Sequence, residues 1–380
     1  MINSKIFTEN PEQEQWRALL QYSYKANIRR YYNDSEIVVA GTDGEESEKA
    51  FDSIADAIAG AMLQADEYFR ASQVASLHVE PLLLYYGTTN LLYAMSMLVS
   101  GQRASIQNHG MQIRTDINSV SISNTRIQFS HSSDGGIHVF AKNLGFTKDL
   151  CSYNQYEWTL GDFFDSIAEI SDDYCHCYGH TSKILLLDVV KTADGVVEKV
   201  NAEEESDNIF INVEGFSKAY LRPQEGKNEK NESVYILRHK INGIDISHNS
   251  YSGQPYLQIA HDINGRLITI PEELNMYISL FALCSLCRYN PNIWYPFVTQ
   301  DSTGERLLVE KLLYYSRRII PNVVLNRIEK RQISFVSDKY VPEDRIHLVG
   351  EHEVKDMVRK EIVEQMSRQQ ANNIVQQRRR

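Results

Sequence analysis

The sequence predicts an α+β protein, in which a split α-helical bundle is interrupted by a mostly antiparallel β insertion. Two segments far apart in the chain, residues 80–98 and 277–294, carry apolar side chains on more than one face, as helices do when other helices surround them. The residues between them mostly alternate apolar with polar, which is typical of strands. We therefore predict that the stretch around Leu84 packs against the stretch around Leu283.

The chain is predicted to have four parts. Residues 1–110 form an N-terminal helical half, 111–270 the antiparallel β-rich insertion, and 271–332 a C-terminal helical half that packs on the first. Residues 333–380 form an extension with an amphipathic helix and a basic tail, and the sequence leaves open whether that tail is ordered. Because the apolar stripe of this helix needs a surface to pack on, the helix either packs on the body of the protein or meets a partner. We expect a protein partner or a homo-oligomer. The stripe consists of Val354, Val358, Ile362 and Met366.

The N-terminal half has three predicted helices, at residues 11–32, 47–72 and 81–100. Pro81 suits the first turn of the third helix, and Gly101 suits the left-handed residue that follows a helix end. Gly87 inside this helix costs about 1 kcal/mol relative to alanine. We expect a crossing helix that packs closely at Gly87 to compensate.

The insertion is predicted to consist of hairpins and one short helix at residues 160–170. The predicted strands are residues 120–122, 127–129, 137–139, 184–190, 209–213, 234–238, 256–259 and 267–270, the last two paired across the turn at 262–265. The C-terminal half then begins at Pro271 with a helix that ends before Pro291. A further helix covers residues 304–330 and is expected to be interrupted at Pro321.

Composition excludes several classes of protein. With 39 Lys and Arg against 50 Asp and Glu, the net charge of −11 disfavours binding of nucleic acid or an anionic membrane by the surface as a whole. Five cysteines in 380 residues are too few, and odd in number, for a secreted disulfide scaffold. The sequence contains neither a signal peptide nor a run of about 18 apolar residues. We expect a cytoplasmic protein that does not bind membranes.

Three motifs resemble the YaaC-like proteins of bacteria. They are Pro81-Leu-Leu-Leu-Tyr-Tyr-Gly, His109-Gly-Met, and the run from Leu283 to Trp294 with its Arg-Tyr-x-Pro-x-x-Trp element. The resemblance covers roughly residues 50–330 and implies a soluble bacterial protein, without implying a particular activity. An interaction or regulatory role is the function that we expect.

The Tyr-Tyr-Gly helix and the Arg103-to-His109 segment after it resemble the HEPN superfamily of helical bundles. In that superfamily an Arg, four to six residues and a His form a metal-independent ribonuclease site. The resemblance implies that His109 acts as general acid or base and that Arg103 holds the phosphate of an RNA substrate. By analogy alone, such an enzyme would serve in stress response or phage defence. The alternative is a structural Arg103 that caps the helix C-terminus.

A second set of residues marks either a ligand site or a structural clamp between the two helical halves. The guanidinium of Arg288 follows a long apolar run, so it requires acceptors or an aromatic face. Glu80 and the nearby rings are the candidate partners. If the set is a site, a nucleotide or another small molecule is the expected ligand. The set consists of Tyr85, Tyr86, Asn90, Arg288, Tyr289 and Trp294.

No cofactor and no metal is expected. The sequence lacks a Gly-rich phosphate loop, a nucleophile elbow and a dinucleotide fingerprint. Cys175, Cys177 and His180 would need Cys284 or Cys287 to complete a tetrahedral zinc site. Those two cysteines lie in an apolar helix, where cysteine usually behaves as a small buried hydrophobe.

Overall fold

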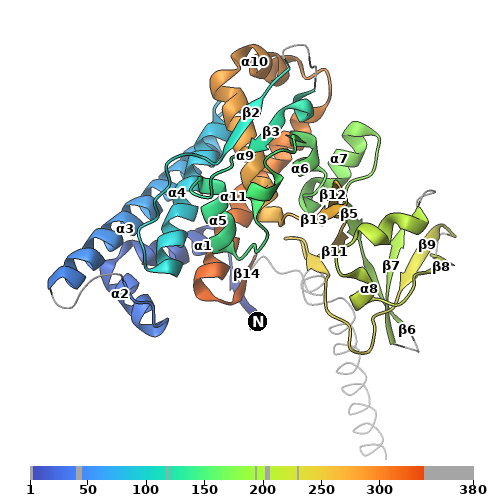
Figure 1. The fold of residues 1–380 in the computed structure, drawn as a ribbon, viewed down its shortest axis with the longest axis horizontal. Coiled ribbons are helices and arrows are strands. Elements are labelled where there is room, and N and C mark those ends of the chain that lie inside the picture. Colours follow the sequence, from blue (N-terminus) through green and yellow to red (C-terminus); the bar gives the residue numbers. More distant parts are fainter. Residues whose placement is uncertain are drawn as a thin grey trace, which may run out of the picture. The chain divides into compact units, whose positions relative to one another are not determined.

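The computed structural model describes residues 3–39, 45–116, 119, 121–192, 195–201, 206–228 and 231–337. Helices and small antiparallel sheets make up this part of the chain, which confirms the α+β class (Figure 1). Residues 12–334 belong to one compact unit. Residues 5–11 and 335–337 belong to a second unit. Strand β1 (Asn3–Thr8) pairs with β14 (Gln332–Ser337). The predicted helix at 354–366 and the basic tail lie outside the described residues, and the four-part division stays a prediction.

The helices before the insertion are α1 (Pro11–Leu20), α2 (Lys25–Asp34), α3 (Glu45–Val74) and α4 (Glu80–Ser100). The single helix predicted at 11–32 is wrong, because the 3-10 turn η1 (Gln21–Ser23) divides it. Two polar side chains donate hydrogen bonds to carbonyl oxygens that would accept backbone N–H groups in a continuous helix. Ser23 Oγ donates to Leu20 O at 2.7 Å, and Asn27 Nδ2 donates to Gln21 O at 2.9 Å.

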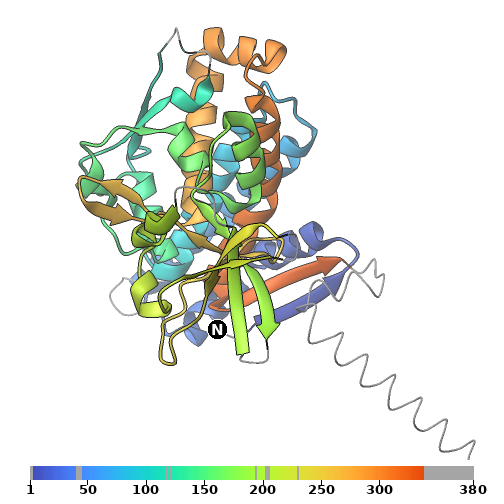
Figure 2. The ribbon, with the colours of Figure 1, turned by 90° about the vertical axis from the view of Figure 1, so that its right-hand side faces the viewer.

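The long helices α3 and α4 run side by side (Figures 1 and 2). A Cβ atom added at Gly87 would lie 2.8 Å from the ring of Phe69 on α3, so the expected close packing at Gly87 is confirmed. Gly101 ends α4 with a φ of 65°, as predicted. Helix α4 has the length and apolar composition of a membrane span, yet 61% of that window is buried inside the structure. A core helix of a soluble protein has these properties.

The insertion contains more helix than predicted. Its helices are α5 (Gly136–Leu144), α6 (Leu160–Phe164), α7 (Ser171–Tyr178) and α8 (Phe216–Ala219), with 3-10 turns η2 (Ile122–Asn124), η3 (Leu150–Tyr153), η4 (Ala168–Ile170) and η5 (Ser206–Asn212). The strands predicted at 137–139 and 209–213 are therefore wrong. At the first, the apolar pattern continues from Ile137 to the buried Phe140 and Ala141, which is helical spacing.

Short antiparallel sheets make up the rest of the insertion. One joins β2 (Met111–Arg114), β3 (Arg126–Phe129) and β4 (Trp158–Thr159), and another joins β10 (His248–Asn249), β11 (Pro255–Gln258) and β5 (Ile184–Leu186). A four-stranded sheet has the order β6 (Asp188–Thr192), β7 (Gly195–Asn201), β9 (Ser233–Leu237) and β8 (Gln224–Lys227). Strand β12 (His261–Ile263) pairs with β13 (Arg266–Ile268). Residues 256–258 pair with β5, so the hairpin predicted for them with 267–270 is wrong.

After the insertion follow α9 (Glu272–Tyr289), α10 (Pro291–Gln300) and α11 (Glu305–Glu329). Helix α9 ends before Pro291 as predicted, but Pro321 does not interrupt α11, where it is buried among Ile319, Ile320 and Val324. Packing of that apolar face offsets the missing backbone hydrogen bond.

Helices α4 and α9 pack against each other, which confirms the central prediction from the sequence. The rings of Tyr85 and Tyr277 stack with centroids 5.5 Å apart, and Phe281 follows at 5.7 Å from Tyr85. Thr89 lies near Tyr277 while Tyr86 bonds Arg288, so the two helices run antiparallel. The chain therefore leaves its helical body, builds the insertion and returns.

Candidate functional site

The candidate site lies where α4, α9 and the loop before β2 meet. Tyr85 on α4 is buried, and its hydroxyl lies 2.8 Å from Nδ1 of His109 and 3.3 Å from the hydroxyl of Tyr277. His109 itself is exposed, with its ring against those of Tyr85 and Phe281. The fold thus brings one member of the predicted ribonuclease pair onto the predicted tyrosine cluster.

The hydroxyl groups below His109 can hold its ring in the tautomer of a general base. Thr89 Oγ1 donates to the carbonyl of Tyr85 at 2.9 Å. The Tyr85 hydroxyl lies 2.8 Å from Nδ1 of His109 and 3.3 Å from the Tyr277 hydroxyl, so it can accept Nδ1–H while it donates to Tyr277. In that arrangement Nε2 of His109 is the unprotonated nitrogen, as a general base requires.

Arg288 supplies the positive charge beside His109. Its Nη1 donates to the Tyr86 hydroxyl at 2.6 Å, and its guanidinium lies 4.9 Å from the centre of the Tyr289 ring. The rings of Tyr85 and Phe281 remove part of the water around the His109 ring, which lowers its pKa, and the charge of Arg288 lowers this pKa further. His109 is therefore neutral at pH 7, beside a fixed cation.

The other residues of the predicted cluster lie apart from this cation. Glu80 pairs with Arg317 and not with Arg288. Trp294 is buried, and its indole N–H donates to His78 O at 3.3 Å, so it holds the turn that precedes α4. Asn90 is half-buried on α4, and no contact among the described residues joins it to the cluster.

Arg103 is placed differently from Arg288. It is exposed in the loop after Gly101, and its Nη1 lies 3.5 Å from Ser53 Oγ on α3. Of the two arginines, only Arg288 acts on the pKa of His109. The catalytic role of Arg103 stays a prediction.

Tyr277 and Phe281 belong to the site, but the sequence-based prediction of site residues did not include them. The signal was present, because Tyr277, Phe281, Cys284 and Arg288 recur at spacings of four, three and four residues and so share one face of α9. Only the register of α9 against α4 distinguishes that face from the other apolar faces.

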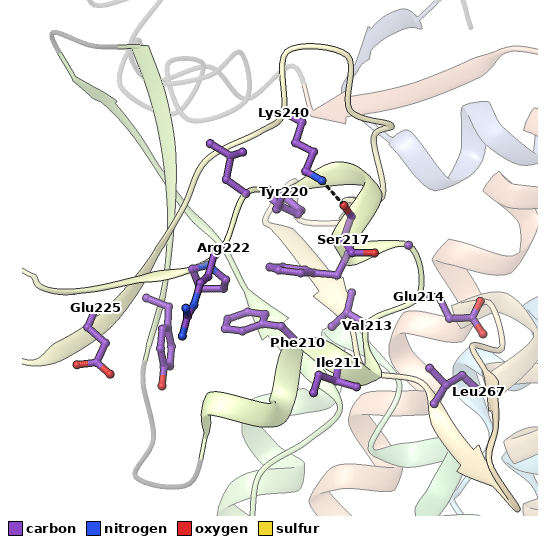
Figure 3. A pocket seen from close by; sticks show the side chains of 15 residues that line it. Phe210, Ile211, Val213, Glu214, Ser217, Tyr220, Arg222, Glu225, Lys240 and Leu267 are labelled. Carbon is purple, nitrogen blue, oxygen red and sulfur yellow. Dashed lines mark hydrogen bonds between the residues drawn. The ribbon is translucent and has the colours of Figure 1, made fainter.

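A separate cavity of about 1080 Å³ lies in the insertion, between η5 and α8 (Figure 3). Its floor is aromatic, since Phe216 stacks on Phe210 at 4.7 Å and on Tyr220 at 5.0 Å. Arg222 and Lys240 also line it. A planar ligand with a negative group would suit these side chains, but none of the predicted site residues lines this cavity.

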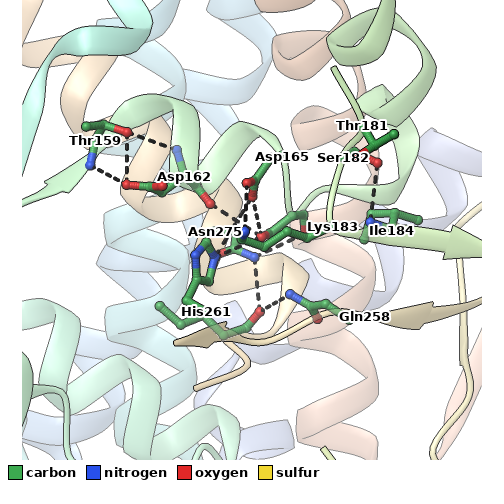
Figure 4. A network of polar contacts seen from close by, with 12 residues as sticks. Thr159, Asp162, Asp165, Thr181, Ser182, Lys183, Ile184, Gln258, His261 and Asn275 are labelled. Carbon is green, nitrogen blue, oxygen red and sulfur yellow. Dashed lines mark hydrogen bonds and ion pairs between the residues drawn. The ribbon is translucent and has the colours of Figure 1, made fainter. Parts of the chain in front are cut away.

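A buried polar network joins α6, β12 and α9 (Figure 4). Ser166 Oγ donates to Asp165 Oδ1 at 2.6 Å and accepts from Nε2 of His261 at 3.1 Å, while Lys183 Nζ lies 3.5 Å from Asp165. This direction of bonding is the reverse of a nucleophilic serine, which donates to its histidine. Ser166 is only 1% exposed, so the network is structural.

Stability should depend on pH through Asp165. Burial raises the pKa of Asp165 to about 7, and the nearby charge of Lys183 partly opposes this rise. An unfolded aspartate releases its proton near pH 3.9, so the native state holds one extra proton between about pH 4 and 7. The free energy of unfolding of the wild type, relative to Asp165→Asn, should fall by up to about 1.4 kcal/mol per unit as pH rises through this range.

Urea denaturation at several pH values measures this difference. Burial lowers the pKa of His261 to about 3, which removes stability as pH falls below 6.5. Both proteins keep His261, so most of its titration cancels in the difference. A difference that is flat or rises with pH would contradict the raised pKa of this buried carboxyl group.

The cysteines considered as zinc ligands do not lie together in one group. Cys177 Sγ lies 3.6 Å from Thr303 O, Cys287 Sγ lies 2.7 Å from His78 O, and Cys284 is buried in α9. In the part of the chain that the structure describes, Cys175, Cys177 and His180 form no ligand group with either of the other two.

The fold and the site together define an α+β protein whose helical body carries an exposed histidine and arginine on a tyrosine core. Residues 12–328 match the family model of the YaaC-like proteins, so the chain belongs to the YaaC-like family. No curated protein and no solved structure matches it. The comparisons do not show the resemblance to the HEPN superfamily.

Proposed function

We propose that this chain is a cytoplasmic regulatory protein that binds a small phosphate-bearing ligand, such as a nucleotide, at the tyrosine pair that carries His109 and Arg288. The observation that carries the proposal is an exposed guanidinium fixed by the Tyr86 hydroxyl beside an exposed, neutral imidazole. Response to such a ligand would control a protein partner or a second copy of the chain.

The chemistry of the site favours a phosphate. Tyr86 takes one of the five guanidinium N–H groups, so Arg288 keeps donors for two oxygens of one phosphate group. Tyr289 is 66% exposed and offers a ring on which a base can stack. The net charge of −11 opposes a long polyanion more than a small one.

A thermal-shift screen against nucleoside mono-, di- and triphosphates tests the proposal. A ligand at 100 times its dissociation constant stabilises the native state by about 2.7 kcal/mol, which raises the melting temperature. We expect this shift in the wild type and in the control Arg103→Gln, and its loss in Arg288→Gln. The proposal fails if no nucleotide shifts the wild type, or if Arg288→Gln responds fully. If only Arg222→Gln loses the thermal shift, the nucleotide binds in the cavity of the insertion instead.

Cleavage of RNA is the second candidate function at the same site, favoured by an exposed His109 whose bond to Tyr85 can leave Nε2 unprotonated. That nitrogen would accept the proton of a ribose 2′-hydroxyl as its oxygen attacks the phosphorus. The bond to the 5′-oxygen breaks, and the leaving oxygen takes a proton from water. Arg288 would stabilise the charge on the phosphate, in the role that the sequence motif gives to Arg103. A part in stress response or phage defence would follow only from such an activity.

Incubation of the full chain with RNA in EDTA tests cleavage. We expect His109→Ala and Arg288→Gln to lose at least tenfold in rate, whereas Arg103→Gln should cleave like the wild type. Equal cleavage by the wild type and His109→Ala would exclude this site. If Arg103→Gln loses cleavage and Arg288→Gln keeps it, the catalytic arginine is Arg103, as the sequence motif implies, and not Arg288.

A further inference from the structure

A group of metal-ligating side chains lies outside the site described above, on α5 and the loop that follows it. His138 on α5 is buried, Cys151 in η3 is half-buried, and Asp149 between them is exposed. One ligand atom from each residue lies within 4.8 Å of the other two. No motif in the sequence indicates this group, because the three residues meet only when α5 forms.

The distance between sulfur and nitrogen matches a shared metal ion. Cys151 Sγ lies 3.5 Å from Nδ1 of His138. A tetrahedral Zn²⁺ with bonds of about 2.3 Å to sulfur and about 2.0 Å to nitrogen places these two atoms about 3.5 Å apart. Sγ also lies 3.8 Å from Nε2, so it sits beside the ring and not on the line of the Nδ1 lone pair. The Cys151 side chain would therefore have to turn toward Nδ1 to bind the same ion.

The tautomer of His138 also suits a ligand. Ser130 Oγ donates to Ser132 O at 3.0 Å, so at His138 it accepts, and the donor is Nε2–H at 3.2 Å. Nδ1 then carries the lone pair and is the ring nitrogen nearer to Cys151 Sγ. Metal-binding histidines are commonly held in this way, with the other ring nitrogen donating to an oxygen of the protein.

Acidic groups surround the same place. The carboxylates of Asp149 and Asp134 both act electrostatically on the His138 ring. Asp149 Oδ1 accepts the backbone N–H of Cys151 at 3.0 Å, which fixes the carboxylate next to the thiol. A divalent cation bound here would be attracted by both carboxylates.

We propose that His138, Asp149 and Cys151 bind one Zn²⁺ ion through nitrogen, oxygen and sulfur, with the fourth position open to water. Cys151 would bind as the thiolate and release its proton to solvent when the ion enters. Without the ion, the Cys151 thiol lies within hydrogen-bonding distance of the His138 ring. The proposal does not depend on the phosphate site, since His109 and Arg288 contribute nothing to it.

Cobalt binding to the full chain, stripped of metal with EDTA, tests the proposal. We expect one Co²⁺ per chain, a thiolate-to-cobalt charge-transfer band in the near ultraviolet, and displacement of the cobalt by Zn²⁺. Cys151→Ser should abolish the band, and Ser130→Ala should weaken binding by about 10- to 100-fold. The control Cys175→Ser/Cys177→Ser should bind like the wild type.

Two results would overturn the zinc site. One is a wild type that shows no charge-transfer band at micromolar to millimolar cobalt. The other is a band that persists in Cys151→Ser or disappears in the double control. Circular dichroism of each metal-free variant shows whether it is folded, and Asp149→Asn, at an exposed position, provides a second ligand variant with little effect on folding.

Discussion

Replacing Glu305 with alanine should lower the free energy of unfolding by about 3–5 kcal/mol. Glu305 at the start of α11 is 0% exposed, and its carboxylate is fully hydrogen-bonded. Alanine would leave one buried and four partly buried donors without their acceptor and would release the segment around η2. Urea denaturation measures the change. The donors are Ser121 Oγ at 2.6 Å, Ile122 N at 3.0 Å, Ser123 N at 3.1 Å, Tyr178 Oη at 2.6 Å and Thr303 Oγ1 at 2.8 Å.

Glu310→Ala is the matched control on the same helix. Glu310 forms an ion pair with Arg306 at 2.8 Å, but both side chains are well exposed. Such pairs contribute about 0.3–0.5 kcal/mol, so the control should remain close to the wild type. Equal losses in the two variants would mean that Glu305 is not the buried acceptor that the structure assigns.

Replacing Tyr85 with alanine should also cost about 3–5 kcal/mol, because it leaves a cavity between α4 and α9. The ring is 1% exposed and contacts Tyr277, Phe281 and His109. Tyr85→Phe keeps the ring and loses only the hydroxyl, so about 1 kcal/mol is expected. Thermal and urea denaturation of both variants measure the difference.

Tyr24→Ala provides the surface control, since Tyr24 is 66% exposed. It should change the free energy of unfolding by less than about 0.5 kcal/mol. If Tyr85→Ala behaved like this control, α4 and α9 would not share a packed core.

The long helices could be predicted because their apolar residues extend over many turns. Helices α3, α4 and α9 begin and end within a few residues of their predicted limits. In the insertion, short segments such as 137–139 fit both a strand and a helix. Burial of Phe140 and Ala141 in the core favours the helix α5 over a strand. The local sequence pattern gives no information about this burial.

The residue types of the site could be predicted, but their partners could not. The sequence singled out Arg288, His109 and the paired tyrosines, and the structure joins all of them. The sequence paired His109 with Arg103, its neighbour along the chain, whereas the cation beside it comes from α9. Glu80 was considered for Arg288 and instead meets Arg317 of α11. Such pairs depend on helix register, which one sequence does not specify.

A nuclear magnetic resonance titration of the His109 ring tests the central claim most directly. The claim is that the chain returns after the insertion to place Arg288 beside His109. We predict that the pKa of His109 lies below 6.5 in the wild type, rises in Arg288→Gln, and stays unchanged in Arg103→Gln. A pKa that rises in Arg103→Gln and does not respond to Arg288→Gln would contradict the account.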